Sequence, residues 1–460
     1  MKKSILIVLM AAAAFTSQAQ LPAAVANHLQ YMLDSLCKKN NIKGASAAVL
    51  VPGMGTWKGA AGLSHGNVKL ATDMWLPIGS NTKTFTAALM LKLQEEGKLN
   101  LDDTIGKWIQ GVKNVSGKIT IRQMLNHTSG LFNYTDANAF SDSMNASYTR
   151  VWQPEEMYQF IDTPDFAPGS SWEYSNTNFL LAGIIIKKIQ GEPFEVTVRN
   201  KILNPQSLSK SIVFPQETPG GIIPHGWSDH GNGSYLEDMQ ATYNWDNTSF
   251  LSMATSAGAI VSTAEDNVKF WDALMTGKII NSASLAQMTK TVPVSGTASY
   301  GLGIMRYTDV NGAGRVVYCH GGTCFGYINE NLRDSLNGIC ITVLSNQDSV
   351  YNNLLFNRVI VPMHKYLLNL PAAGIATTTA YADVQVFPNP ATDKVQVQLS
   401  GIGTAAMYQV YDMTGRLQVS AAITNGVNTI DISLLPAGMY NTRVVAGERV
   451  VSYGKLAVTR

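Results

Sequence analysis

Apolar side chains between residues 20 and 370 recur with the periods of both helix and strand. Mostly apolar runs at residues 45–51 and 338–345 predict two buried strands. Helical spacing begins at Ser80 and continues to Gly97, where glycine ends the segment. We therefore expect residues 20–370 to form one large domain of mixed helix and strand, of the α/β or α+β class.

Two further helices are predicted in this region. Residues 179–191 show helical apolar spacing, and so do residues 351–368. Pro362 lies inside the second segment, and proline lacks the backbone N–H that an inner helical turn requires. We therefore expect the second helix to be kinked or split at Pro362.

The pattern changes after residue 370. Residues 371–382 are small and polar and show no periodicity, which is typical of a linker. From residue 383 to residue 460, short alternating segments such as 394–399 are separated by turn residues. Several short strands at regular intervals predict a small all-β sandwich over residues 383–460.

Composition says more about the partners of the chain than about its fold. With 460 residues, 45% of them hydrophobic, the chain is long enough for two or three domains. Lysine and arginine number 34, aspartate and glutamate 32, and the net charge is +2 with no long block of like charge. Neither nucleic acid nor an acidic membrane surface is therefore an indicated partner.

The first residues predict export. Met1-Lys-Lys precedes an apolar run over residues 4–15, and Ser17-Gln-Ala19 is a small-x-small cleavage site. This is the pattern of a signal peptide over residues 1–19. A membrane anchor is the alternative, but the apolar run is shorter than the ~20 residues of a spanning helix.

Export places the cysteines in an oxidising compartment, where disulfides are permitted. Sequence alone does not choose among the pairings of Cys37, Cys319, Cys324 and Cys340. A bridge from Cys319 to Cys324 would stiffen the segment between them, and small buried thiols are the equal alternative. His225 and His230 share a glycine-rich loop with Asp229, a set too sparse for a metal site, and we expect no cofactor.

One serine lies in a setting that favours nucleophilic catalysis. Ser80-Asn-Thr-Lys83 is an S-x-x-K motif at the start of a predicted helix. Residues i and i+3 share a helix face with Cβ atoms roughly 5–6 Å apart, so Lys83 can reach the Ser80 hydroxyl. Three other S-x-x-K matches, at Ser35, Ser207 and Ser452, open no comparable helix.

Two residues are candidates for the base that a serine nucleophile needs. Lys83 can serve if burial or nearby positive charge lowers its pKa far below the ~10.4 of free lysine. Alternatively, Lys83 stays charged and lowers the proton affinity of Tyr174, the first residue of the motif Tyr174-Ser-Asn176. Taken alone, this second motif is also consistent with a turn before the helix at 179–191.

A third motif, His320-Gly-Gly322, is the only H-x-G or K-x-G in the sequence. Its glycines allow the backbone to approach a substrate closely. Ser80, at a helix N-terminus, is expected to offer its N–H to an oxyanion hole, and the Thr323 N–H is the expected second donor. A lone histidine is more often structural, so the combination of the three motifs indicates the site.

The order S-x-x-K, Y-x-N and H-x-G resembles the serine β-lactamase and penicillin-recognising DD-peptidase superfamily. The similar branch contains class C β-lactamases, DD-carboxypeptidases, D-aminopeptidases and related esterases. Flanking segments such as residues 124–131 and 256–263 agree. The resemblance implies an α/β sandwich in which Ser80 lies on a helix between an all-helical region and a five-stranded antiparallel sheet.

The same resemblance implies roles for the motif residues. Ser80 would form an acyl-enzyme, aided by Lys83 and Tyr174. Substrate-binding residues would be Asn176, which holds the substrate amide, then His320, Gly321, Gly322 and Thr323 on the opposite wall.

The third motif departs from the family pattern. Many β-lactamases carry K-T-G, whose lysine helps to attract the substrate carboxylate. His320 has a reference pKa near ~6.5 and is by default mostly neutral at pH 7, and Gly321 removes the threonine hydroxyl. We therefore expect weaker carboxylate binding and favour a peptidase or esterase, although Arg306 and Arg315 could restore positive charge.

The tail resembles the C-terminal sorting domain of the type IX secretion system. The matching segments are Phe387-Pro-Asn-Pro390, Tyr411-Asp-Met-Thr-Gly415 and Leu435-Pro-Ala-Gly-Met-Tyr440. The resemblance implies passage across the outer membrane of a Gram-negative cell by that machinery. A carbohydrate-binding or adhesive β-module is the alternative, but the tail has few aromatic residues for a binding platform.

Together these patterns predict a secreted serine hydrolase that acts through a Ser80 acyl-enzyme on D-amino-acid peptides, amides or esters. The expected partners are a small-molecule or peptide substrate and the secretion machinery. Two alternatives remain open from sequence: a class C type β-lactamase that uses the same residues, and a penicillin-binding or sensor module without turnover.

Overall fold

The computed structural model describes residues 20–230, 235–310, 315–348, 355–370, 383–400, 406–412, 416–446 and 449–459. The chain divides into two compact units, with the break after Asn369. The predicted signal peptide at residues 1–19 and the predicted linker at residues 371–382 lie outside the described residues. No helix among the described residues is long and apolar enough to cross a bilayer.

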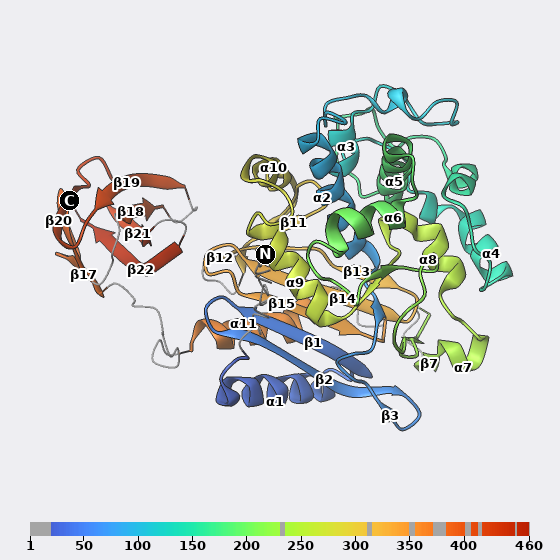
Figure 1. Cartoon of the computed structure of the whole chain (residues 1–460), viewed down its shortest axis with the longest axis horizontal. Coiled ribbons are helices and arrows are strands. Elements are labelled where there is room, and N and C mark those ends of the chain that lie inside the picture. The colour runs from blue at the N-terminus through green and yellow to red at the C-terminus, as the bar shows by residue number, and fades with distance from the viewer. Residues whose placement is uncertain are drawn as a thin grey trace, which may run out of the picture. The chain divides into compact units, whose positions relative to one another are not determined.

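An antiparallel sheet of ten strands organises the first unit (Figure 1). In spatial order its strands are β3 (Val68–Lys69), β2 (Gly55–His65), β1 (Gly44–Val51), β15 (Cys340–Ser345), β14 (Tyr327–Asp334), β12 (Arg315–Cys319), β11 (Met305–Val310), β10 (Ala298–Tyr300) and β9 (Val292–Ser295), with β13 (Gly322–Cys324) also paired to β14. The predicted buried strands are confirmed as β1 and β15, which are neighbours. The sheet has more than the five strands that the resemblance implied, because β9 to β11 extend it beyond β12, β3 extends it beyond β2, and β13 pairs with β14.

Helices cover both faces of this sheet. Successive strand residues point to opposite faces. Arg333 of β14 donates a hydrogen bond to Asp272 of α9 (Ala264–Met275), whereas the next residue, Asp334, accepts one from His364 of α11 (Val361–Leu368). Helices α9 and α11 therefore lie on opposite faces, and α1 (Ala23–Lys39) packs beside β1 and β2.

The helical region is built around α2 (Thr82–Glu95), which is buried over almost its whole length. The helix was predicted to open at Ser80, but Ser80 lies in the 3₁₀ turn η1 (Gly79–Asn81) and α2 begins two residues later, at Thr82. Helix α5 (Asn176–Gln190) packs against α2 and ends at Gly191, whose φ of 71° is the left-handed value that a helix C-cap favours. Both predicted helices are confirmed.

The predicted helix at residues 351–368 is described from residue 355 onward. It consists of a π turn, η7 (Phe356–Ile360), followed by α11 with Pro362 in its first turn. The helix is therefore continuous through Pro362, and the change from π to α hydrogen bonding immediately before this residue accommodates the missing proline N–H.

Shorter elements complete the first unit. The helices are α3 (Ile121–Leu125), α4 (Asn138–Ala146), α6 (Phe194–Val198), α7 (Met239–Tyr243), α8 (Thr248–Ala254) and α10 (Ser282–Met288). The short turns are η2 (Ile105–Lys107), η3 (Tyr134–Asp136), η4 (Pro154–Phe160), η5 (Arg199–Leu203) and η6 (Thr255–Ala257). The strands β4 (Leu76–Pro77), β8 (Ile260–Ser262) and β5 (Ile212–Val213) form one small sheet, and β6 (Trp227–Ser228) pairs with β7 (Glu237–Asp238).

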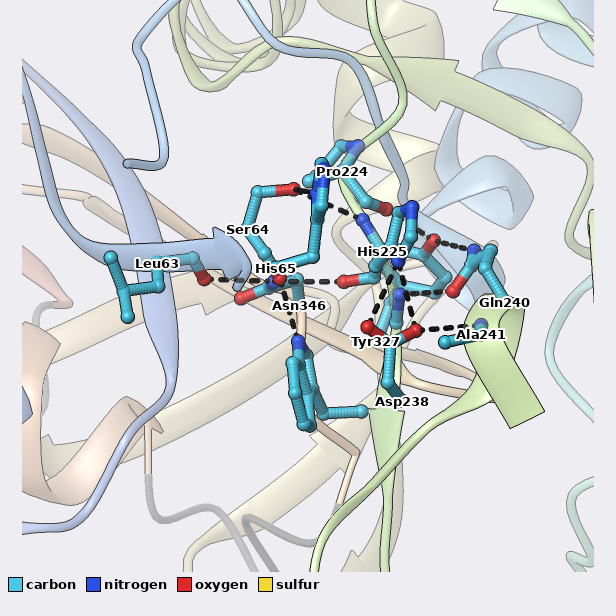
Figure 2. A network of polar contacts seen from close by, with 12 residues as sticks. Leu63, Ser64, His65, Pro224, His225, Asp238, Gln240, Ala241, Tyr327 and Asn346 are labelled. Atoms are coloured by element: carbon cyan, nitrogen blue, oxygen red, sulfur yellow. Dashed lines mark hydrogen bonds and ion pairs between the residues drawn. The ribbon is translucent and has the colours of Figure 1, made fainter. Parts of the chain in front are cut away.

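A polar network holds the segment around β6 and β7 against the main sheet (Figure 2). Asn346 Nδ2 donates to the carbonyl oxygens of Leu63, Ser64 and His225. The imidazole of His225 stacks on that of His65, with ring centroids 3.9 Å apart. These contacts join the end of β2 to the end of β15 and to the loop that contains His225.

The same loop is tied to β14. His225 Nδ1 donates to the Asp238 carboxylate at 2.9 Å. The Tyr327 hydroxyl donates to the Pro224 carbonyl at 2.6 Å and accepts from Gln240 Nε2 at 2.9 Å (Figure 2). His225 therefore has a structural partner of its own in this loop.

The second unit is a sandwich of two antiparallel sheets. One contains β16 (Asp383–Phe387), β17 (Lys394–Ser400) and β20 (Gly426–Asp431), and the other β19 (Leu417–Ile423), β18 (Ala406–Tyr411), β21 (Gly438–Ala446) and β22 (Arg449–Val458). Burial alternates along β17, and its inward residues share one core with Tyr408 and Val410 of the other sheet. The all-β character predicted for the tail is confirmed.

Candidate active site

Ser80 lies where the turn η1 meets the short strand β13. A Cβ built at Gly79, whose φ is 47°, would lie 2.9 Å from the Thr323 nitrogen. A Cβ at Gly322 would lie 2.8 Å from the Ser80 nitrogen. Because both positions are glycine, the two backbones can pack closely, and the structure brings the segment Gly79-Ser80 against the segment Gly322-Thr323. Thr323 is exposed and Ser80 half-buried, so a substrate can reach them.

Asn329 of β14 helps to hold this junction. Its Nδ2 donates to the Gly322 carbonyl at 3.1 Å and also to the carbonyl of Ile78, which precedes η1. One buried amide therefore links β13 to the turn that carries Ser80.

Lys83 is completely buried beside Ser80. Its Nζ lies 3.0 Å from Ser80 Oγ, 2.6 Å from Asn176 Oδ1 and 2.8 Å from the Ala257 carbonyl oxygen. Among the described residues no carboxylate pairs with it. Desolvation by burial lowers the pKa of Lys83 well below its usual value.

Tyr174 lies close to both Lys83 and Ser80. Nζ of Lys83 lies 4.9 Å from the centroid of the Tyr174 ring, and the Tyr174 hydroxyl shares a hydrogen bond with the Ser80 side chain. Burial raises the pKa of Tyr174. The phenol is therefore held in its protonated form while the neighbouring amine is driven toward its neutral form.

Asn176 is the first residue of α5 and is engaged at both ends of its amide. Its Oδ1 accepts from Lys83, and its Nδ2 donates to Thr135 Oγ1 at 3.0 Å. Asn176 is therefore a partner of Lys83 in this structure, and its contact with a substrate amide stays a prediction.

His320 is almost fully buried, at 3% exposure. Its Nδ1 lies 2.7 Å from the Gly321 carbonyl oxygen, which can only accept, so Nδ1 carries the proton. Its Nε2 then accepts from the Tyr300 hydroxyl at 2.8 Å. Burial and the neighbouring Lys83 lower the pKa of His320 to about 3. The His320 ring is therefore neutral, as the reference pKa of histidine already predicted. Burial and the neighbouring Lys83 hold its pKa well below that reference value.

Two residues of this region carried no role in the sequence prediction. Tyr300 is one. The other is His127, fully buried, whose Nδ1 accepts from the Ser175 backbone N–H at 3.2 Å. The His127 ring centroid lies 4.3 Å from that of Tyr174 and 4.7 Å from that of Tyr300. His127 falls in the flanking segment 124–131, and its proximity to Tyr174 depends on folding rather than on local pattern.

The structure also shows the surroundings of the cysteines and of Arg315. All four cysteines are buried free thiols, so the structure contains no bridge from Cys319 to Cys324. The Cys324 side chain packs beside Gly79 instead, and burial raises the pKa of Cys324 to about 12. Arg315 lies 2.6 Å from the buried Asp334 carboxylate. It is neutralised there and supplies no free charge to the third motif.

Comparison with known proteins identifies the family of this chain. Residues 23–358 match the model of the Beta-lactamase family. The chain belongs to the β-lactamase family. Residues 385–459 of this β-lactamase-family protein match the model of the secretion system C-terminal sorting domain. The family and the sorting domain that the sequence resembles are thus confirmed, and the tail indicates secretion.

Three relatives illustrate the range of the family. Penicillin-binding protein 4* of Bacillus subtilis strain 168 is 25% identical over 335 residues, which are 70% of this chain and 72% of that protein. A D-stereospecific amidohydrolase from Streptomyces sp. has 32% identity and a TM-score of 0.63, covering 73% of this chain and 97% of the other. D-amino acid amidase from Ochrobactrum anthropi SV3, complexed with D-phenylalanine, has 25% identity and a TM-score of 0.66, covering 76% and 100%. The β-lactamase-family protein described here is a serine hydrolase.

Proposed function

We propose that this protein cleaves amide bonds of D-amino acids, in D-amino acid amides, short D-peptides or related esters, through an acyl-enzyme on Ser80. The observation that carries the proposal is the environment of Lys83. Its ammonium group would be fully buried without a carboxylate, and a buried unpaired charge is costly. Lys83 therefore rests as a neutral amine beside the nucleophile.

A neutral amine at this position has the hydrogen-bonding pattern of a base. It donates its two hydrogens to Asn176 and to the Ala257 carbonyl, the two nearest acceptors. Its lone pair is then free to accept the Ser80 proton from 3.0 Å. Tyr174, whose pKa is raised, is the weaker candidate for this step.

The acylation step follows from these positions. Ser80 Oγ attacks the substrate carbonyl carbon and its proton passes to Lys83 Nζ. The N–H groups of Ser80 and Thr323 stabilise the oxyanion. When the tetrahedral intermediate collapses, the C–N bond breaks, Tyr174 supplies a proton to the leaving amine, and Lys83 returns its proton to Tyr174. Water then hydrolyses the Ser80 ester.

The choice of D-amino acid amides rests on two observations. The relatives of known structure include a D-stereospecific amidohydrolase and a D-amino acid amidase. The third motif carries a neutral, buried His320 rather than a lysine, so it offers no ammonium group to a substrate carboxylate. Hydrolysis of β-lactams by the same residues is the second candidate, favoured by the similarity to a penicillin-binding protein.

A substrate screen tests the proposal. The purified protein and its Ser80→Ala variant would be assayed in parallel with D- and L-amino acid amides, aryl esters and a chromogenic cephalosporin. We expect Ser80-dependent release of ammonia from D-amides, with the L-amides at least tenfold slower. Faster turnover of the cephalosporin than of any amide would establish the lactamase instead, and no turnover with no labelling of Ser80 would establish a binding module.

The route out of the cell is part of the proposal. We assign residues 1–19 to a signal peptide, residues 20–370 to the hydrolase and residues 383–460 to a type IX sorting domain that delivers it to the surface or medium of a Gram-negative cell. Deleting residues 383–460 should retain active enzyme inside the outer membrane, as measured by cell fractionation. Equal release of the shortened and full-length chains would contradict this assignment.

A further inference from the structure

A carboxyl group lies directly against the third motif. Glu330 belongs to β14, and a Cβ built at Gly321 would lie 2.6 Å from its Oε1 and 2.7 Å from its Oε2. No larger residue could stand at position 321 while Glu330 keeps this place. Gly321, the middle residue of His320-Gly-Gly322, thus leaves the space that the Glu330 carboxyl occupies.

This carboxyl group has no partner among the residues that the structure describes. Glu330 is 9% exposed, and among the described residues none donates a hydrogen bond to it or forms an ion pair with it. Asp334, on the same strand and the same face, shows the contrast, since Arg315 and His364 both bind it. Burying an acid without a partner is unfavourable. An acidic residue with only a structural role would be expected to have ion-pair partners, as Asp334 has and Glu330, within the described part of the chain, does not.

The position of Glu330 connects it to the substrate. In the register of β13 and β14, Gly322 pairs with Asn329, and both face the turn that carries Ser80. Glu330 is the next residue of β14, so its carboxyl lies one position farther along, beside Gly321 and on the opposite face of the strand from Asn329. Gly321 precedes the Thr323 amide by two residues, about 7 Å along an extended strand. A substrate carbonyl held at Thr323 therefore has substituents, a few bonds away, within reach of this acid.

We propose that Glu330 is a specificity-determining residue that excludes a substrate carboxylate from the third motif and admits a neutral or cationic group there. The inference rests on the proposed function and narrows it to substrates such as amides and esters, as opposed to peptides that end in a free carboxylate beside the scissile bond. An ionised Glu330 repels such a carboxylate, because like charges close together in a desolvated place are strongly unfavourable. His320 is neutral, so it supplies no positive charge to offset this repulsion.

The charge of Glu330 changes within an accessible pH range. Burial raises the pKa of Glu330 to about 8. On the same face of the sheet, Arg315 and His364 both bind Asp334. The Cys319 thiol is the further titratable neighbour, and burial raises its pKa. Discrimination against carboxylates should therefore strengthen as pH rises through about 8.

Two substrates that differ only in this charge provide the test. One is N-acetyl-D-alanyl-D-alanine, with a free carboxylate, and the other is its neutral C-terminal amide. The ratio of kcat/KM for the amide to that for the acid cancels any pH effect on Ser80, Lys83 or Tyr174. In the wild-type protein this ratio should rise at least tenfold between pH 7 and pH 9. In Glu330→Gln it should stay within twofold, and in Glu330→Lys the acid should be favoured at both pH values.

The matched control is Glu195→Gln on α6, which makes the same charge change outside the site and should behave as wild type. A ratio that is flat in the wild type, or that rises equally in Glu330→Gln, would overturn the inference while amide hydrolysis persists. Loss of Ser80-dependent hydrolysis of both substrates in the wild type would instead refute the proposed function.

Discussion

The Tyr300 hydroxyl donates a hydrogen bond to Nε2 of His320 across 2.8 Å. The two residues are 20 positions apart in sequence and both are buried. This bond, with that from Nδ1 to the Gly321 carbonyl, fixes the imidazole in one neutral tautomer. The third motif is thereby held rigid and uncharged next to Lys83.

Removing that hydroxyl should cost stability. Tyr300→Phe leaves the buried Nε2 of His320 without its donor, and an unsatisfied buried polar group costs about 1–3 kcal/mol. We expect a decrease of that size in the free energy of unfolding, measured by chemical denaturation at pH 7. The matched control is Tyr31→Phe, an exposed tyrosine on α1, which should change nothing. Equal stability of the two variants would show that the bond does not form.

Replacing Lys83 with arginine separates the two candidate bases. Arginine keeps a positive charge but cannot be deprotonated in a protein. If Lys83 is the base, Lys83→Arg should lose at least ~1000-fold in kcat, as loss of general-base catalysis and of correct positioning requires. If the charge of Lys83 only activates Tyr174, the variant should retain a substantial fraction of wild-type activity. Single-turnover acylation rates of the soluble variants would decide.

The pH dependence of the wild type should follow from the same residue. Burial lowers the pKa of Lys83 well below its ordinary value, and the neutral form is the active base. The acylation rate should therefore rise as Lys83 loses its proton and reach its plateau well below pH 10.5. A rate that keeps rising to pH 10 and above would indicate that the phenol of Tyr174 must ionise. Stopped-flow acylation by an aryl ester across the pH range measures this.

Tyr174→Phe should affect amides more than activated esters. A protonated Tyr174 is needed to supply a proton to a poor leaving group, and general acid catalysis contributes typically 100- to 10,000-fold. An aryl ester has a leaving group that departs without a proton. We expect a loss of about 100-fold or more with D-amides and a much smaller loss with the aryl ester. An equal loss with both would show that Tyr174 acts before the leaving group departs.

Gly322→Ala should separate the two amides of the expected oxyanion hole. The added methyl group would come within 2.8 Å of the Ser80 nitrogen, so β13 and η1 must move apart. Loss of one donor costs about 100- to 1000-fold in rate. Gly220→Ala is the control, because the nearest atom to its added Cβ is 3.5 Å away. An unchanged kcat in Gly322→Ala would place the oxyanion hole elsewhere.

Local pattern was sufficient for the elements that carry the motifs. The apolar spacing after Ser80 and the mostly apolar run of β15 are properties of short segments, and the helix and the strand that they predict are both present. The spacing of three residues predicted that Lys83 faces Ser80. Ser80 lies in the 3₁₀ turn before α2, and Lys83 Nζ is 3.0 Å from its Oγ.

What local pattern could not supply is contact between distant segments. The Ala257 carbonyl that binds Lys83 is 174 residues away in sequence, and any residue type would offer the same backbone oxygen. His127 meets Tyr174 because two loops fold together, and its place in a loop gives no sign of this. Glu330 looks like one polar residue among several on β14, and only the packing against Gly321 distinguishes it.

Covalent capture of the nucleophile tests the central claim most directly. The purified protein would be incubated with a fluorophosphonate probe, digested, and the modified peptide identified by mass spectrometry, with Ser80→Ala and Lys83→Arg as parallel samples. We predict rapid, single-site labelling of Ser80 in the wild type, none in Ser80→Ala and strongly slowed labelling in Lys83→Arg. Labelling at another residue, or D-amide hydrolysis that continues in Ser80→Ala, would contradict the account.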